Sequence, residues 1–310
     1  MDNIIIPNSE RDKYVVVLSG GGVTGIGEVS ALVRLNELGL LQNKTHFYCS
    51  SVGSLLGGML ACKASISYIY NAMNTVDYQK FKDDSFGYIM DIARLLDSYG
   101  WYKGDYIEKW FGDHVEVITG KRDITLKEVH DRYGTYLCVP VLLNYTTTVF
   151  VDHTTDPNLE LVKLVRRACG MQLFYKGIKD YPSPNEKLKM WTDAGLFLNF
   201  PFDQAAKAHG TDKVLGLNLM SSKQLHELRD GPDPVPELPP NLIYVILNLV
   251  DVARELASRV HIKSEYWNET IKIDCGDISS TNFAITKSQK EILLNNGKKA
   301  VEDYLASKTK

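Results

Sequence analysis

The segment Tyr14–Gly25 reads YVVVLSGGGVTG, and it decides the fold of the chain. Its first half is a near-continuous run of apolar and β-branched residues, which is typical of a strand covered on both faces in a parallel sheet. Three glycines end this strand, and apolar residues then recur at helical spacing at Val29, Leu32 and Leu35, with Gly39 at the helix end. The order strand, glycine loop and helix predicts an α/β protein.

The rest of the chain continues this alternation. Thr45–Ser50 predicts a second strand and Gly53–Cys62 a helix packed tightly on the sheet, so the first two strands should pair in parallel. Further strands are predicted at Tyr136–Leu143, Thr147–Asp152, Leu188–Thr192, Lys213–Leu219 and about Thr270–Asp274, and further helices at Leu159–Ala168, Phe202–His209 and about Leu242–Val260.

Two capping-box patterns predict helix starts after Thr125 and after Thr286, and the five prolines of Gly231–Pro240 predict an extended loop. The sequence contains no internal repeat and no convincing linker. We therefore expect one domain over residues 1–310, with a C-terminal helical extension over about residues 241–310.

The composition excludes several classes of protein. The 310 residues carry 35 Lys plus Arg and 38 Asp plus Glu, and this net charge of −3 argues against a nucleic-acid partner. No apolar run is long enough to span a membrane, and Met1–Lys13 does not resemble a signal peptide, so a cytoplasmic location is expected. Five cysteines without a CxxC pair exclude a zinc site of that type and indicate reduced thiols.

The glycine loop predicts a site for negative charge. Glycines at a strand end let backbone N–H groups converge on a phosphate or an oxyanion, and the following helix adds its positive end. Gly20, Gly22 and Gly25 also match GxGxxG, but the second strand ends in Cys49-Ser50 without the acidic residue that dinucleotide binding requires. A P-loop is excluded because no Gly-Lys-Ser/Thr follows the glycines.

A second motif, Cys49-Ser50-Ser51-Val52-Gly53, lies where a strand turns into a helix. A GxSxG nucleophile elbow belongs at such a junction, and Ser51 and Gly53 fit it, while Cys49 stands in place of the first glycine. The alternative interpretation is that Ser50 and Ser51 only cap the helix.

A third motif, Asp193-Ala194-Gly195, follows a predicted strand. Asp193 is either an ordinary turn residue or a general base that reaches a serine.

In this order, the three motifs resemble those of the patatin-like phospholipases. Gly104-Asp105, Leu143-Asn144-Tyr145 and Arg167-Ala168-Cys169-Gly170-Met171 resemble further landmarks of that family, the last being similar to its Arg-Ala-Ser-x-Ala. The resemblance covers about residues 14–220. It implies a three-layer α/β fold, with a central, mostly parallel sheet and helices on both faces.

The resemblance also implies a site and a reaction. Ser51 would attack an ester carbonyl, and Asp193 would take the proton of the Ser51 hydroxyl. The N–H groups of Gly20, Gly21 and Gly22 would hold the oxyanion. Val52 and Gly53 would complete the nucleophile elbow. No histidine, metal or cofactor is required, and His46 and His209 are expected to be bystanders. The implied activity is that of a phospholipase A or a related lipid acyl hydrolase; a thioesterase or triacylglycerol lipase remains open.

Four departures from the family pattern are present. Thr24 stands where the family has a cation, Cys49 replaces a glycine of the elbow, Ala194 replaces the glycine after the aspartate, and Cys169-Gly170-Met171 only loosely matches the Ser-x-Ala pattern. The departures at Thr24 and Cys49 leave an alternative. A protein that kept the fold as a lipid-binding scaffold and lost turnover is therefore the second hypothesis.

Aromatic residues suggest where a lipid would enter. Phe174 and Tyr175 are candidates for the acyl pocket. Phe81, Phe86, Tyr88, Trp101 and Tyr102 would form either a lid that touches a membrane surface or an ordinary satellite core. The expected partners are a lipid or phospholipid substrate and, transiently, a membrane.

Overall fold

The computed structural model describes residues 6–83, 97–180, 187–230 and 264–309. The strands are β1 (Val15–Leu18), β2 (His46–Cys49), β3 (Gly100–Tyr102), β4 (Tyr136–Leu143), β5 (Thr147–Val151), β6 (Leu173–Tyr175), β7 (Ile178–Asp180), β8 (Lys189–Asp193), β9 (Val214–Met220) and β10 (Thr270–Asp274). The helices are α1 (Asn8–Asp12), α2 (Ile26–Glu37), α3 (Val52–Ala61), α4 (Ile66–Thr75), α6 (Asp105–Thr119), α7 (Leu126–Tyr133), α8 (Leu161–Ala168), α9 (Phe202–His209), α10 (Ser222–Asp230) and α12 (Lys287–Lys308). Short 3₁₀ turns are η1 (Gly22–Gly25), η2 (Tyr78–Phe81), η3 (Thr211–Lys213) and η4 (Ser264–Glu269).

Eight of the described strands form one mixed sheet in the order β10-β9-β1-β2-β4-β8-β7, with β5 paired to β4. The predicted parallel pair is confirmed, because β1 and β2 align from Val15 opposite His46 to Leu18 opposite Cys49. Strands β10, β9, β1, β2 and β4 run in parallel, whereas β5, β8 and β7 follow antiparallel pairings. The carboxyl ends of β1 and β2 therefore lie side by side.

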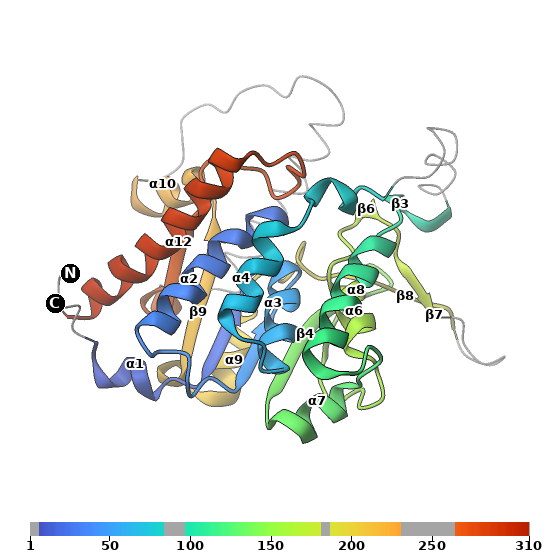
Figure 1. Ribbon diagram of the computed structural model, residues 1–310, viewed down its shortest axis with the longest axis horizontal. Helices are drawn as coiled ribbons and strands as arrows, with labels where there is room; N and C mark the ends of the chain where they lie inside the picture. Colours follow the sequence, from blue (N-terminus) through green and yellow to red (C-terminus); the bar gives the residue numbers. More distant parts are fainter. Residues whose placement is uncertain (1–5, 84–96, 181–186, 231–263, 310) are drawn as a thin grey trace.

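The apolar sequence of β1 has the expected consequence that both of its faces are buried. Val16 and Leu18 face a core shared with α2, α3, α8 and α12, and Val15 and Val17 face a second core shared with α9. Figure 1 shows α2, α4 and α12 lying across the near face of the sheet. The predicted three-layer arrangement, a mostly parallel sheet with helices on both faces, is thus confirmed.

The two predicted capping boxes are also present. Thr125 and Glu128 exchange side-chain and backbone hydrogen bonds at the start of α7, and Thr286 and Gln289 do the same at α12. The predicted loop over residues 231–240 and the predicted helix over about 242–260 lie outside the described residues. Among the helices that are described, none combines the length and the apolar character needed to cross a bilayer.

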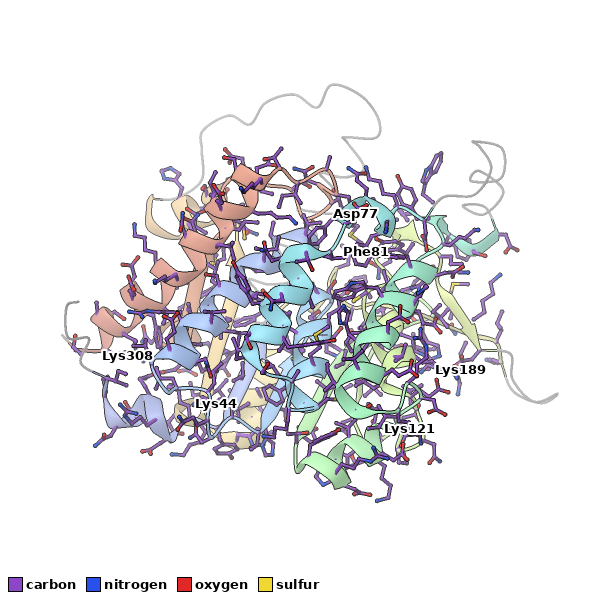
Figure 2. All side chains as sticks on the ribbon, in the orientation of Figure 1. Lys44, Asp77, Phe81, Lys121, Lys189 and Lys308 are labelled. Carbon is purple, nitrogen blue, oxygen red and sulfur yellow. The ribbon has the colours of Figure 1, made fainter. Side chains whose placement is uncertain are left out.

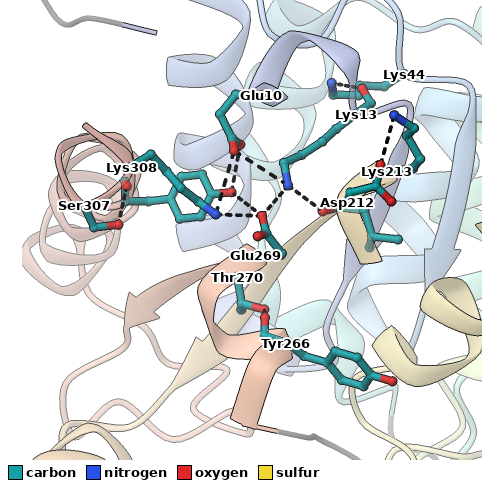
Figure 3. A network of polar contacts seen from close by, with 12 residues as sticks. Glu10, Lys13, Lys44, Asp212, Lys213, Tyr266, Glu269, Thr270, Ser307 and Lys308 are labelled. Atoms are coloured by element: carbon teal, nitrogen blue, oxygen red, sulfur yellow. Dashed lines mark hydrogen bonds and ion pairs between the residues drawn. The ribbon is translucent and has the colours of Figure 1, made fainter. Parts of the chain in front are cut away.

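The C-terminal region adds both β10 and α12 to the body of the fold. A buried polar network joins them to the N-terminal segment, as Figure 3 shows. Lys13, only 1% exposed, forms ion pairs with Glu10 and with Glu269, and Tyr304 on α12 donates to Glu10 Oε2 at 2.8 Å. Lys308 adds an ion pair to Glu269 at 2.8 Å. Buried charges need such partners, so this network ties α1, β10 and α12 together at the amino end of the sheet.

Candidate active site

The turn between β2 and α3 holds Ser51 in an unusual conformation. Its φ is +47° and its ψ is −125°, a region that side-chain-bearing residues rarely adopt. A Cβ on Gly53 would lie 2.7 Å from Ser19 O and 2.8 Å from Leu18 O, so only glycine allows α3 to approach β1 this closely. A strained serine followed by this close approach is the geometry of a nucleophile elbow.

The two serines of the motif have different surroundings. Ser50 is fully buried and its Oγ donates to Leu198 O at 3.1 Å. Ser51 is partly exposed, lines a cavity, and makes no side-chain capping bond to α3 although it occupies the N-cap position. The capping interpretation therefore does not account for Ser51.

Asp193 ends β8 and is 4% exposed. Its Oδ1 accepts the N–H of Gly195 at 2.6 Å, which closes a tight turn, and its own N–H donates to Gly170 O at 3.1 Å. Asp193 lines the same cavity as Ser51. The fold thus brings together two residues that are 142 positions apart in the sequence.

The glycine loop borders this cavity through Gly21 and Gly22. The Gly20 N–H donates to Asn199 O at 2.9 Å, and Asn199 Nδ2 donates back to Gly20 O at 3.0 Å. Within the part of the chain that the structure describes, no partner takes the N–H groups of Gly21 and Gly22. Two amides that border a cavity without partners are suited to bind an anion.

Thr24 holds the loop from inside. Both its N–H, at 3.1 Å, and its Oγ1, at 2.8 Å, donate to Gly21 O. Below the loop, the fully buried Glu28 accepts from Ser19 N at 2.8 Å and Ser19 Oγ at 3.0 Å. Burial raises the pKa of Glu28 to about 8, and the bonds from Ser19 offset only part of that effect.

The cavity is mostly apolar and has a volume of about 100 Å³. Its walls beyond the elbow come from α4, η2 and α6, through Met73, Val76, Phe81, Ile107 and Trp110. Figure 2 shows Phe81 in the upper half of the molecule and Lys44, which precedes the start of β2, in the lower half. The cavity therefore lies at the carboxyl ends of β1 and β2, where open parallel sheets place their ligands.

The aromatic residues singled out from the sequence are placed as follows. Tyr175 lines the cavity, whereas Phe174 stacks on Phe283, a lining residue, with ring centroids 5.3 Å apart. Phe81 is buried in the main core as well as lining the cavity, and Tyr102 packs against Phe174 at 4.8 Å. Trp101 lies beside it in β3, while Phe86 and Tyr88 fall outside the described residues.

The two histidines nearest the motifs lie away from the cavity. His46 starts β2, at the opposite end of that strand from Ser51, and burial lowers the pKa of its imidazole to about 4. His209 contacts the Tyr48 hydroxyl at 3.0 Å. Neither histidine lines the cavity.

Sequence reasoning missed three residues of this region: Gln172, Asn199 and Glu28. Gln172 and Asn199 line the cavity and bond to the backbone of Asp193 and Gly20, respectively. Their partners are 21 and 179 positions away, so no local motif marks them. Glu28 could have been found in the sequence, because it places a carboxyl on the apolar face of the helix that follows the glycine loop.

Comparisons with known proteins agree with this geometry. The family model described as patatin-like phospholipase matches residues 16–206. The uncharacterized protein YqhO of Bacillus subtilis is 24% identical over 298 residues, 93% of this chain and 97% of YqhO. Triacylglycerol lipase 4 of Saccharomyces cerevisiae is 22% identical over 223 residues, which make up 66% of this chain but 24% of the lipase. The solved structure of VipD from Legionella pneumophila has a TM-score of 0.60 at 17% identity, over 96% of this chain and 67% of VipD.

Proposed function

The chain belongs to the patatin-like phospholipase family, and from this membership we propose that it is a lipid acyl hydrolase with a Ser51–Asp193 dyad. The observation that carries the proposal is that one cavity is lined by Ser51, Asp193, Gly21 and Gly22, and that the amides of these two glycines have no partner among the described residues. The apolar walls of that cavity suit a fatty-acyl group. Phospholipids are the first substrate class to test, and the yeast relative's name makes triacylglycerols the second.

The proposed reaction has two halves. Asp193 takes the hydroxyl proton as Ser51 Oγ attacks the ester carbonyl, and the N–H groups of Gly21 and Gly22 hold the negative oxygen that forms. The C–O bond of the ester then breaks, and Asp193 returns the proton to the departing alcohol. A water molecule next attacks the acyl-serine, gives its proton to Asp193 and releases the fatty acid, after which Ser51 regains a proton.

The amide donors in this proposal differ from the first expectation at one position. Gly20 was expected to be a donor, but its N–H is engaged by Asn199 O. We assign Gly20 the role of anchoring the loop, so that Gly21 and Gly22 remain available for the oxyanion. Removing one such donor typically costs about 100- to 1000-fold in rate.

The test is hydrolysis of a chromogenic short-chain ester and of phospholipid vesicles, in the presence of a chelator. Wild type is compared with Ser51→Ala, Asp193→Asn and the control Ser50→Ala, which alters the neighbouring serine that does not line the cavity. We expect turnover in wild type and in the control, and its loss in both dyad variants. Turnover that persists in Ser51→Ala would refute the dyad, and turnover abolished by the chelator would refute a metal-independent reaction.

A folded wild-type protein that binds vesicles but hydrolyses no ester would support the second hypothesis, a lipid-binding scaffold. We further propose that residues 1–310 act as one domain, since β9 and β10 join the sheet that carries the site. We also propose a cytoplasmic location, with transient membrane contact while a lipid is bound. The location rests on the five cysteines, which are all buried and free, as expected in a reducing compartment.

A further inference from the structure

The carbonyl of Ser51 accepts hydrogen bonds from two separate elements. Ser54, on the same helix turn, donates through its N–H at 2.8 Å and through its Oγ. Cys169, at the C-cap of α8, donates its thiol hydrogen from 3.3 Å. Of the bonds that the Ser51 carbonyl accepts, the one from Cys169 is therefore the one that comes from a different part of the fold.

The segment that begins at Cys169 also holds the other half of the dyad. Gly170 O accepts the N–H of Asp193 at 3.1 Å. Gln172 Nε2 donates to the carbonyl of Asp193 and, at 3.2 Å, to Thr192 Oγ1. Residues 169–172 thus touch the backbone of both proposed catalytic residues.

This link can fix the separation of Ser51 and Asp193, because their strands are not adjacent in the sheet and share no backbone hydrogen bonds. Ser51 follows β2 and Asp193 ends β8, and β4 lies between these strands. Two strand spacings amount to about 10 Å, so small changes in sheet twist would alter the distance between the side chains. Proton transfer, in contrast, requires a hydrogen-bond distance of about 3 Å.

We propose that Cys169 and Gln172 are positioning residues, and that the connection Cys169–Gln172 sets the distance between Ser51 and Asp193. This inference rests on the proposed hydrolase function and concerns the geometry of the same site. The thiol remains a donor at neutral pH, because burial raises the pKa of Cys169 to about 12. Both residues also line the cavity that holds Ser51 and Asp193.

The experiment measures kcat and KM for the chromogenic ester in four variants. Cys169→Ala removes the donor and Cys169→Ser keeps one, while Gln172→Met keeps the side-chain length without its N–H groups. Cys62→Ala is the matched control, since Cys62 is also a buried thiol and lies at the far end of α3, outside the cavity lining. Thermal unfolding midpoints of all variants are recorded alongside the kinetics.

We expect Cys169→Ala and Gln172→Met each to lower kcat by about 3- to 10-fold with little change in KM, as for one lost hydrogen bond. Cys169→Ser should recover most of the rate, and Cys62→Ala should keep it while lowering the midpoint about as much as Cys169→Ala. A kcat that tracks the midpoint in all four variants would overturn the inference, as would full activity in Cys169→Ala and Gln172→Met. If those variants are active while Ser51→Ala is inactive, only the positioning role fails; an inactive wild type overturns the proposed function and this role together.

Discussion

Replacing Glu28 with glutamine should remove a large pH dependence from the stability of the protein. The Glu28 carboxyl is fully buried beneath the glycine loop, and its Oε1 accepts both bonds from Ser19. Its Oε2 has no hydrogen-bond partner among the described residues. A charged carboxylate would leave a buried anionic oxygen unsatisfied, so the folded protein favours the protonated acid.

The sign and size of the effect follow from the pKa in the two states. The pKa of Glu28 is about 8 in the folded protein, against an ordinary value of 4.5 for an exposed chain. Between these values the unfolded chain releases the proton and the folded protein keeps it, so stability falls as the pH rises. The stabilising contribution is complete below about pH 4.5 and is lost by about pH 8, a change of about 5 kcal/mol.

The assay is urea unfolding of wild type and Glu28→Gln at several pH values from about 5 to about 8.5. Subtracting one series from the other cancels the titration of all other groups. As the pH rises across this range, the wild-type protein should lose several kcal/mol of unfolding free energy relative to Glu28→Gln. Glu37→Gln, on the exposed end of the same helix, is the control and should show a nearly constant difference. A constant difference for Glu28→Gln as well would refute a buried, protonated carboxyl.

Two further predictions concern other parts of the fold. Gly22→Ala places a Cβ against the Ser280 carbonyl at a φ of +56°, so it should displace a proposed oxyanion donor and lower kcat by at least about 10-fold. The control Gly134→Ala has a similar φ of +61° but free space around the new Cβ, so it should cost about 1 kcal/mol of stability without loss of kcat. Equal kcat values for the two variants would contradict this account. Lys13→Met removes the buried cation of the network and leaves Lys308, which is more exposed, as the partner of Glu10 and Glu269. It should lower the unfolding free energy by about 3 kcal/mol, the low end of the range for a broken buried pair, while kcat of the folded protein stays unchanged. A stability within about 1 kcal/mol of wild type would show that the network contributes little.

The parts of the fold that the sequence predicted are those with local signals. The apolar run at Val15–Leu18, the exact span Tyr136–Leu143 and the two capping boxes all depend on residues within a few positions of one another. The helix Asp105–Thr119 was not predicted, although Gly104 and Gly120 flank it in left-handed conformations. Its buried apolar residues Ile107, Trp110, Phe111 and Val115 recur at helical spacing, so a local signal for this helix was present in the sequence and was not used.

The residues of the candidate site also fall into those that a local motif predicts and those that only tertiary contacts define. Ser51 and Asp193 could be singled out because each lies in a short motif at a strand end. The contacts that organise them could not, since Asn199 reaches Gly20 across 179 positions and Cys169 reaches Ser51 across 118. Only tertiary structure decides which of the three loop amides remains free, and therefore which of them can bind an oxyanion.

The departures from the family pattern are accommodated by neighbouring residues. Thr24, in place of a cation, directs both of its donors at the Gly21 carbonyl, which keeps that oxygen turned into the loop. Cys49, in place of a glycine, is fully buried, and Gly57 on the facing turn of α3 leaves the room that its sulfur needs, because a Cβ there would overlap it. Ser51 consequently retains its positive φ. The departures at Thr24 and Cys49 alter what supports the site and remove no group that the proposed reaction uses. We therefore infer an active hydrolase rather than a scaffold that has lost turnover.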